Sequence, residues 1–314
     1  MNTRTPMNSL GMLAGSWLLS SSYAQVLKRV AEERLSGRGY SFDVEAVKVS
    51  REKTERARCE HWCGSLGGLV DGVITDGLMG ERDAQRGFVL TRSGKTAIIP
   101  VHGLLVRHAS MVNGSSQPEG VSYAQIVGRC GAAASAGAQN IVLDIDSPGG
   151  TVDGAEAMVQ DMLTLQEKTG VRVHAFAADM AASGAYVLMC ACLGAKVCGA
   201  TASIGSIGVY TVRLDESAMA EAQGVKVLVV STGANKGAFV PGSVVNEGQI
   251  AALQKEVDTL GEWFVRLVNA SRDLNLTLGE APADGSVYIG REAEQLGLVD
   301  GITTMRELVL AVEG

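Results

Sequence analysis

The sequence predicts an α/β protein, and three observations carry that prediction. From Thr96 onward, short apolar runs rich in β-branched residues alternate with segments of helical periodicity, as in strands joined by crossover helices. Hydrophobic residues make up 46% of the chain and charged residues 19%, which supplies enough apolar surface for a buried core. The 39 glycines against 6 prolines indicate many tight turns in a globular chain.

The length and the change in composition predict an extension followed by a main domain. The 314 residues correspond to about two domains at roughly 150 residues each. Residues 1–95 contain a helical pattern ending near Arg34, so we expect an N-terminal helical extension that continues as a charged and then a glycine-rich segment. The main domain is expected over residues 96–302 and a C-terminal helix over 303–314.

The first apolar stretch, residues 10–19, follows Arg4 and precedes small residues, so it superficially resembles a signal peptide. Glycines and a serine interrupt it, and from Leu19 to Ala31 apolar residues recur every three or four positions. That spacing favours a helix packed on the surface over a cleaved signal. The sequence contains no run of about 18 uninterrupted apolar residues, so we expect no stable membrane span.

Charge and cysteine content limit the partners and cofactors. The net charge of −7 leaves no basic field for a nucleic-acid backbone, so we expect no nucleic-acid partner. Six irregularly spaced cysteines do not make a disulfide scaffold and fit a reducing compartment, hence a cytoplasmic location. Cys59, His61 and Cys63 are close in sequence, but a tetrahedral zinc site needs a fourth ligand. We therefore expect no metal and no other cofactor.

The individual elements follow from local periodicity. Short apolar runs predict strands at residues 97–106, 141–146, 171–177, 196–199, 207–212 and 225–230. Helical spacing predicts helices at about residues 122–136, 154–168, 183–193 and 214–223. A longer amphipathic helix is expected to begin at Asn246, a suitable N-cap with Gln249 three residues later. Two short helices, 291–301 and 303–312, are expected around a turn at Asp300 and Gly301.

Two glycine-containing segments follow predicted strands. In residues 144–151 a buried strand ends in Pro-Gly-Gly before a helix, so the free N–H groups could hold an oxyanion, although a plain turn is the alternative. In residues 179–186, Ser183 is flanked by small residues between a strand and a helix. This position suits a nucleophile, and an ordinary N-cap serine is the alternative.

A serine nucleophile needs a neighbouring base. All four histidines precede Ser183, which excludes the chain order Ser-His-Asp, but His102 and His174 remain possible through proximity in the fold. Lysine is the other known partner. Lys236, in the glycine-rich loop after the expected strand 225–230, could project inward, or it could be a solvated loop lysine. A lysine base must be shut away from water, since otherwise it keeps its proton at neutral pH.

Five ordered segments together resemble the S49 family of serine peptidases, the signal peptide peptidase A group. The resemblance covers about residues 97–301, and it is greatest to the phage-encoded capsid assembly or head maturation proteases, which share the forms Ile-Pro-Val-His-Gly and Asp-Ile-Asp-Ser-Pro-Gly-Gly. The segments that carry it are residues 141–151, 180–186, 202–209, 232–236 and 287–300. Two departures are a segment between Ser183 and Ser206 that is one residue longer and a glycine after Lys236.

The resemblance implies a role for each matching residue. Ser183 would be the nucleophile, Lys236 its general base in a Ser-Lys dyad, and Ser206 a serine that orients the lysine. The backbone N–H groups of the oxyanion hole would come from Gly149 or Gly150 and from Gly184. The implied fold is a crotonase-like, ClpP-like superhelix of ββα units, and family members assemble into rings or domes, so a homo-oligomer is expected.

The function that follows is a serine endopeptidase that cleaves scaffold and capsid proteins during phage head maturation, in the host cytoplasm and the procapsid interior. Degradation of membrane-released peptides, as by signal peptide peptidases, is one alternative. A crotonase-type enzyme acting on acyl-CoA thioesters would need a carboxylate near the turn, and Glu156 is the candidate. The last alternative is an inactive structural protein with the same fold, which a solvent-exposed Lys236 would favour.

Overall fold

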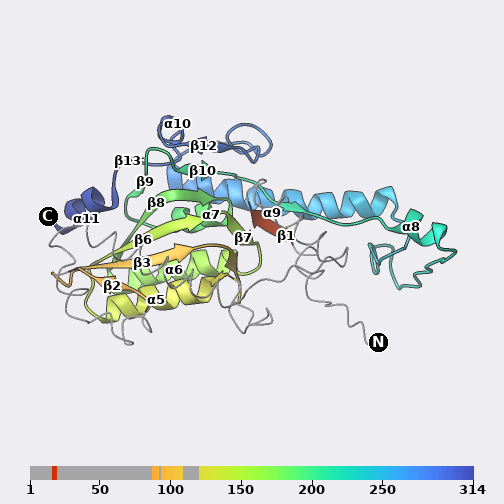
Figure 1. Ribbon diagram of the computed structural model, residues 1–314, viewed down its shortest axis with the longest axis horizontal. Helices are drawn as coiled ribbons and strands as arrows, with labels where there is room; N and C mark the ends of the chain where they lie inside the picture. Colours follow the sequence, from red (N-terminus) through yellow and green to blue (C-terminus); the bar gives the residue numbers. More distant parts are fainter. Residues whose placement is uncertain (1–15, 20–86, 92, 109–119) are drawn as a thin grey trace, which may run out of the picture.

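The computed structural model describes residues 16–19, 87–91, 93–108 and 120–314, and they form a sheet with helices on both faces (Figure 1). The main sheet has the strand order β12-β10-β8-β6-β3-β2. Its inner strands run parallel, while β2 and β12 are antiparallel to their neighbours. The strands are β2 (Val89–Leu90), β3 (Thr96–His102), β6 (Asn140–Ser147), β8 (Arg172–Ala182), β10 (Ser203–Gly205) and β12 (Val287–Ile289). The short strands β9 (Lys196–Cys198) and β13 (Gly301–Ile302) pair with each other, and β9 also pairs with β8.

A second, smaller sheet has the order β11-β1-β7-β4-β5. Its strands are β1 (Ser16–Leu19), β4 (Leu105–Val106), β5 (Val121–Ser122), β7 (Gly149–Thr151) and β11 (Tyr210–Thr211). Strand β7 continues the chain directly after β6, and β11 follows β10 after four residues. The two sheets are therefore linked where the main strands end.

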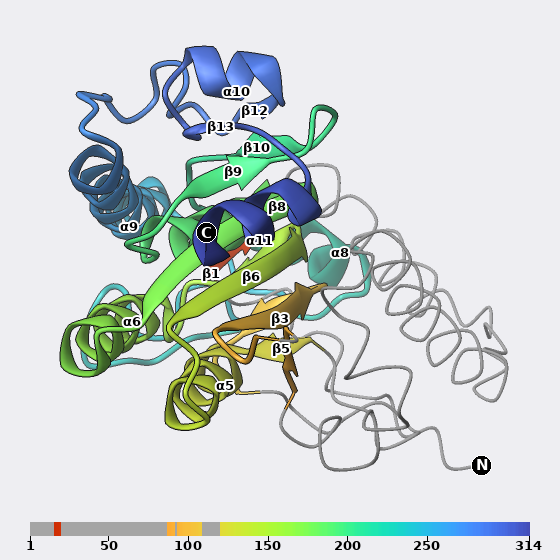
Figure 2. The same cartoon turned by 90° about the vertical axis from the view of Figure 1, so that its left-hand side faces the viewer.

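Helices cover the main sheet on both faces because its strands alternate apolar side chains up and down. Ile99 and Leu143 belong to the larger core cluster, and Ile98 and Val142 to the smaller one on the opposite face. The larger cluster includes residues of α5 (Tyr123–Ser135), α6 (Ala155–Thr169), α7 (Gly184–Cys190) and α9 (Glu247–Arg272). The smaller cluster is covered by α11 (Met305–Glu313). Figure 2 shows α5, α6 and α9 along one side of the strands.

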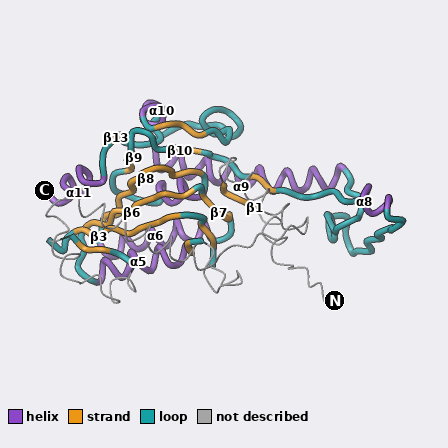
Figure 3. Tube along the Cα trace, viewed as in Figure 1, coloured by secondary structure: helices purple, strands orange, loops and turns teal. Residues whose placement is uncertain are grey.

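Residues 212–246, which we name the arm, project from this body. They contain α8 (Ser217–Ala222) and otherwise turns and loop (Figure 3). Figure 1 shows α8 at the far end of the molecule, beyond the N-terminal end of α9 and away from α7. Large apolar side chains of the arm are open to solvent, with Leu228 75% and Val230 97% exposed.

The structure confirms the α/β class and most of the expected elements. The predicted helices at 122–136, 154–168 and 183–193 correspond to α5, α6 and a shorter α7, and 214–223 to the shorter α8. Asn246 caps α9 as expected, because its Oδ1 accepts a hydrogen bond from the Gln249 N–H. The ClpP-like superhelix remains a prediction, as do the domain divisions at 95 and 302; β2 precedes the first division and pairs with β3.

Four expectations are wrong in detail. Residues 225–230 form no strand, because no neighbouring strand pairs with them in the arm. Of the strand expected at 207–212, only Tyr210–Thr211 forms. The helix expected at 291–301 is α10 (Arg291–Gln295), and Gly301 begins β13 instead of lying in a turn. The N-terminal helix was expected to include Leu19, but Ser16–Leu19 is a strand. The rest of the expected N-terminal helix lies outside the described residues.

Within the described residues, none of the helices has the length and apolar character that a membrane crossing requires.

Candidate active site

Ser183 lies at the junction where β8 ends and α7 begins. Its N–H donates to the Gly205 carbonyl (2.7 Å), and its own carbonyl accepts from the N–H groups of Tyr186 and Val187. The backbone has φ 56° and ψ −118°, an unusual conformation for a residue with a side chain, and such strain concentrates at functional positions. A sharp strand-to-helix turn of this kind presents a nucleophilic serine in α/β-hydrolases.

The Ser183 hydroxyl is fully buried, and among the described residues its Oγ has no hydrogen-bond partner. A buried hydroxyl without a partner costs roughly 1–3 kcal/mol, so the fold does not gain stability from this serine. Its neighbours Ala181, Ala182 and Ala185 are also fully buried, which packs the junction tightly. The Ser183 hydroxyl therefore neither donates nor accepts a hydrogen bond within the described part of the chain.

On one side of Ser183 lies the glycine turn between β6 and β7. Ser147 pairs with Ala181, and Gly149 and Ser183 each follow two residues later, so the two lie at the same level beyond the sheet. Helix α7 contacts β7. Gly149 has φ 101°, a conformation that favours glycine. The turn is thus brought beside the serine.

Gly150 cannot carry a side chain, because a Cβ there would lie 1.6 Å from the Leu105 carbonyl oxygen. The close approach results from the pairing of β7 with β4, which sets Gly150 opposite Leu105. Gly184 is the first residue of α7, and the first N–H groups of a helix have no acceptor within it. The three glycines therefore lie in the two segments next to Ser183, and the Gly149 N–H donates to the Ser147 Oγ (3.2 Å).

Ser206 lies on the other side of Ser183. Gly205 pairs with Ala182, which sets the following residues, Ser206 and Ser183, next to each other. Ser206 is 5% exposed and has φ 53°, and its N–H donates to the Ser286 carbonyl (2.6 Å). The structure thus brings together Ser183, Ser206 and the three glycines.

Lys236 is not part of this group within one chain. It lies in the arm, in a run of turns after residues 225–230, and is exposed. Its N–H donates to the Gly233 carbonyl, and Figure 1 shows this part of the arm far from α7. The expectation that Lys236 follows a buried strand and projects inward is wrong for the single chain, because the arm has no sheet to continue and no core to enter.

The two histidines left open by the sequence are engaged elsewhere. His102 Nε2 lies 2.6 Å from the Oδ2 of buried Asp144, a pair made across adjacent strands β3 and β6. His174 Nδ1 accepts from the Ala195 N–H, and its Nε2 lies 3.3 Å from Asn140 Oδ1. Burial, with smaller contributions from Arg172 and Lys196, lowers the pKa of His174 to about 4. The His102–Asp144 pair was missed because it depends on strand register.

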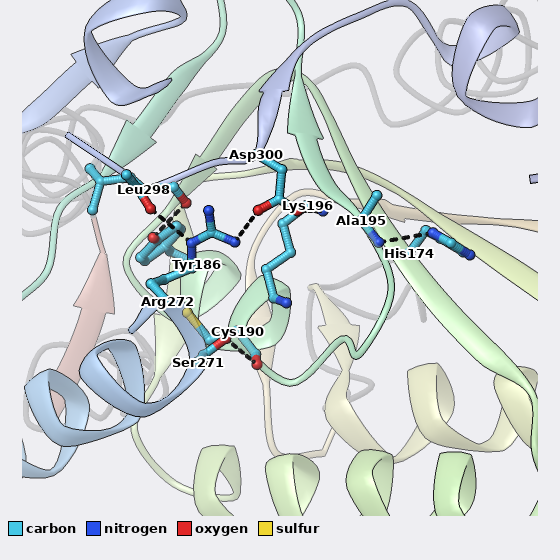
Figure 4. Close-up of polar contacts among 10 residues, drawn as sticks. His174, Tyr186, Cys190, Ala195, Lys196, Ser271, Arg272, Leu298 and Asp300 are labelled. Carbon is cyan, nitrogen blue, oxygen red and sulfur yellow. Dashed lines mark hydrogen bonds and ion pairs between the residues drawn. The ribbon is translucent and has the colours of Figure 1, made fainter. Parts of the chain in front are cut away.

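A polar network fixes α7 against α9 and the C-terminal segment (Figure 4). The Tyr186 hydroxyl donates to the Leu298 carbonyl (2.7 Å), and burial raises the Tyr186 pKa well above its ordinary value. Ser271 donates to the Cys190 carbonyl, and Arg272 pairs with Asp300 at 2.6 Å. The network holds α7, the helix that directly follows Ser183.

Lys196, the buried lysine in this network, is not placed to serve Ser183 within the same chain. It pairs with Ala175 on β8, eight residues before Ser183; a register shift takes up two of these residues, so the stretch spans six residues of β6, or roughly 20 Å. Its neighbourhood at the other end of β8 contains buried Cys190, whose thiol pKa burial raises to about 12. Such thiols are inert.

The described residues contain no group of three or more His, Cys, Asp or Glu side chains that could hold a metal ion. Cys130, Cys190, Cys192 and Cys198 are buried and free. The cluster Cys59, His61 and Cys63 lies outside the described part of the chain. Glu156, the candidate for a crotonase-type reaction, lies in the first turn of α6 and is exposed.

Comparison with known proteins finds matches among peptidases. Residues 165–313 match the family model described as peptidase family S49, a range that contains Ser183, Ser206 and Lys236. The capsid assembly protease C of Escherichia phage lambda is 31% identical over 219 residues, which are 67% of this chain and 48% of that protein.

Two further relatives carry peptidase names. A putative signal peptide peptidase SppA of Enterococcus faecium is 28% identical over 52% of this chain and 47% of its own length. Protease 4 of Haemophilus influenzae is 31% identical over 55% of this chain and 28% of its own length. The chain therefore spans about half the length, or less, of the relatives it matches. Its motifs, its α/β fold and these similarities relate the chain to peptidase family S49, whose model it matches over residues 165–313.

Proposed function

We propose that this chain is a serine endopeptidase in which Ser183 attacks the peptide carbonyl and Lys236 accepts the serine proton. One observation carries the proposal: the Ser183 Oγ is buried and without a partner among the described residues, on a strained turn beside two glycines of β7. A hydroxyl with a purely structural role would be hydrogen-bonded, as nearly all buried polar groups are. The Ser183 hydroxyl is therefore available to a group that the single described chain does not supply, such as a general base or a substrate carbonyl.

The general base would come from a neighbouring copy of the chain. A lysine in water keeps its proton at neutral pH and cannot act as a base, and Lys236 of the single chain is exposed. The arm that carries Lys236 also exposes large apolar residues, including Leu228, Val230 and Val244. Packing this arm over the active site of a second copy would bury those residues and desolvate the lysine, which favours its neutral form.

The reaction then follows ordinary acyl transfer. The Ser183 oxygen bonds to the substrate carbonyl carbon as its proton moves to the lysine nitrogen, and the N–H groups of Gly149 or Gly150 and of Gly184 stabilise the oxyanion. Breaking the C–N bond returns the proton to the leaving amine. Water, deprotonated by the same lysine, releases the acyl group from Ser183. Ser206 would orient the neutral amine by a hydrogen bond.

The substrates we propose are proteins of a phage capsid and its scaffold, cleaved in the host cytoplasm or procapsid. The support is similarity to a relative that is named a capsid assembly protease. An extended segment of such a protein would bind as an added strand beside the glycine turn, so recognition would depend mostly on its backbone.

A second candidate function is that of an inactive structural protein. The exposure of Lys236 in the single chain favours it, because a chain that never buries this lysine has no base beside Ser183. The two candidates differ in whether an assembly of copies cleaves peptide bonds.

Mixing two inactive variants tests the proposal. Ser183→Ala and Lys236→Ala should each abolish cleavage of an unfolded protein such as casein, whereas Lys226→Ala, also exposed in the arm, should not. If copies share the dyad, unfolding and reassembling the two variants together should restore activity at up to about a quarter of the sites. No restoration would exclude the shared dyad, and full activity of either single variant would exclude the mechanism.

A further inference from the structure

Strand β1 (Ser16–Leu19) is paired on both of its edges, and one of its partners is β7, which contains the glycines of the candidate active site. It runs antiparallel to β7, with Leu19 opposite Gly149, Leu18 opposite Gly150 and Trp17 opposite Thr151. Its other edge is antiparallel to β11, with Trp17 opposite Tyr210. Figure 1 shows β1 beside β7, although the two are far apart in the sequence.

The two strands that hold β1 are continuations of the strands on either side of β8. Strand β7 continues β6, and β11 follows β10, while β8 between them ends at Ala182. Ser183 comes next, so it lies between the two continuations, and β1 bridges them just beyond the end of β8. A strand in this position joins the two chain segments that flank Ser183.

This is the position that an extended peptide substrate requires. A peptide adds to an open strand edge through main-chain hydrogen bonds, and a reacting carbonyl must lie beside the donors that stabilise its oxyanion. The residues opposite Leu18 and Leu19 are Gly150 and Gly149, the donors of the proposed oxyanion hole. With β1 in place, both edges that could receive a peptide here are already paired.

We propose that Ser16–Leu19 is an internal ligand of the substrate site, which competes with incoming peptides and resembles them in chemistry. The inference rests on the proposed function, since it takes Gly149 and Gly150 to mark the substrate site. It also defines the substrate class: an extended segment with consecutive large apolar residues, like Trp17, Leu18 and Leu19. Access to Ser183 then requires that β1 leaves.

The test measures peptide binding to the full chain in a Ser183→Ala background, so that no cleavage interferes. The probe is a fluorescein-labelled peptide with the sequence of residues 14–24, followed by fluorescence anisotropy. Trp17 is paired on both edges, so Trp17→Pro removes an N–H that bonds one neighbour, while Trp17→Phe retains it. Freed from a tethered competitor, the proline variant should bind the probe about tenfold more tightly than the parent. The phenylalanine variant should bind within about twofold of the parent.

Two outcomes overturn the inference: equal affinity of the parent and the proline variant, or weaker binding by a proline variant that melts at the parental temperature. The second outcome would mean that β1 helps to bind the peptide and does not compete with it. If the proline variant does not fold, hydrogen exchange on the Ser183→Ala chain decides. Saturating probe should expose the amides of residues 16–19 while Gly149–Thr151 stay protected, and unchanged protection of β1 would contradict the proposal.

In this design the internal-ligand proposal and the peptidase mechanism can be contradicted independently. A probe that binds as described but is not cleaved by assembled chains with an intact Ser183 would contradict the peptidase mechanism and leave the internal ligand standing. A chain that cleaves casein but shows no effect of Trp17→Pro on probe affinity would contradict the internal ligand alone.

Discussion

Ser183 and Lys236 lie in two regions of the molecule that are held in different ways. Around Ser183, β8 is paired on both sides, with β6 and β10, and the adjoining residues Ala181, Ala182 and Ala185 are fully buried. In the arm, residues 212–246, the described chain is mostly turn and loop, and Leu228 and Val230 face solvent.

The difference indicates which parts of the proposed site a single chain positions and which part, Lys236, it leaves in solvent. Strand pairing and core packing fix Ser183 and the glycines beside it, the proposed nucleophile and oxyanion donors, before any substrate binds. The arm has its own helix and turns but buries little apolar surface, which is the driving force that would fix its lysine. The comparison thus predicts that substitutions in the body change folding and chemistry in one chain, and that substitutions in the arm act through assembly.

The largest effect is expected from Ser183→Ala. Loss of the nucleophile should reduce kcat/KM for an unfolded protein substrate by at least about a thousandfold. The free energy of unfolding should stay the same or rise, because the variant removes a buried hydroxyl without a partner. Ser135→Ala, an exposed serine in α5, is the control and should retain activity. A Ser183→Ala protein that is strongly destabilised would show that the hydroxyl is structural.

The next effect concerns the glycine turn. Gly150→Ala would bring a methyl group to 1.6 Å from the Leu105 carbonyl oxygen, so β4 and β7 must separate. We expect a loss of about 3 kcal/mol or more in the free energy of unfolding, measured by urea denaturation. Gly128→Ala is the matched control, since nothing lies within 4 Å of a Cβ there and α5 should gain about 0.5–1 kcal/mol. Equal effects of the two substitutions would contradict the close packing of the turn.

The sequence predicted the body far better than the arm, for a physical reason. Helical periodicity over many residues revealed α5, α6 and α9, since one face of each is buried against the sheet. The run 225–230 has the same apolar and β-branched character as a buried strand, but that character produces a strand only where a neighbour pairs with it.

The same distinction holds for the candidate site. The positions of Ser183, Gly149 and Gly150 at strand ends could be predicted because each follows a buried apolar run, whereas their roles in catalysis stay predictions. The position of Lys236 depends on contacts that a local pattern does not contain. Strand β1 was missed because four residues have no measurable period, and its pairing with β7 joins distant parts of the chain.

A third prediction concerns acid stability of the body. His174 accepts a hydrogen bond from the Ala195 N–H and its pKa is lowered to about 4, so the folded chain holds it neutral where the unfolded chain, with an ordinary pKa near 6.5, binds a proton. The free energy of unfolding should therefore be fully present above about pH 6.5 and fall as the pH is lowered towards 4, by about 1–3 kcal/mol.

His174→Gln should flatten the part of this pH dependence that lies between about pH 4 and 6.5, as measured by urea denaturation across that range. The arm contains no histidine, so its solvent exposure by hydrogen exchange should not follow the same titration. An unchanged pH profile in the His174→Gln chain would assign the acid sensitivity to other groups.

The smallest effect on folding is expected in the arm, where it separates stability from assembly. Leu228 is 75% exposed and Leu193, on the body, is 58% exposed, so replacing either by serine should change the free energy of unfolding by less than about 0.5 kcal/mol. If the arm packs on a second copy, Leu228→Ser should shift sedimentation towards the single chain and lower activity at low protein concentration, and Leu193→Ser should do neither. The same sedimentation profile for both variants would mean that the apolar surface of the arm is not buried between copies, and that the base for Ser183 must reach it by another route.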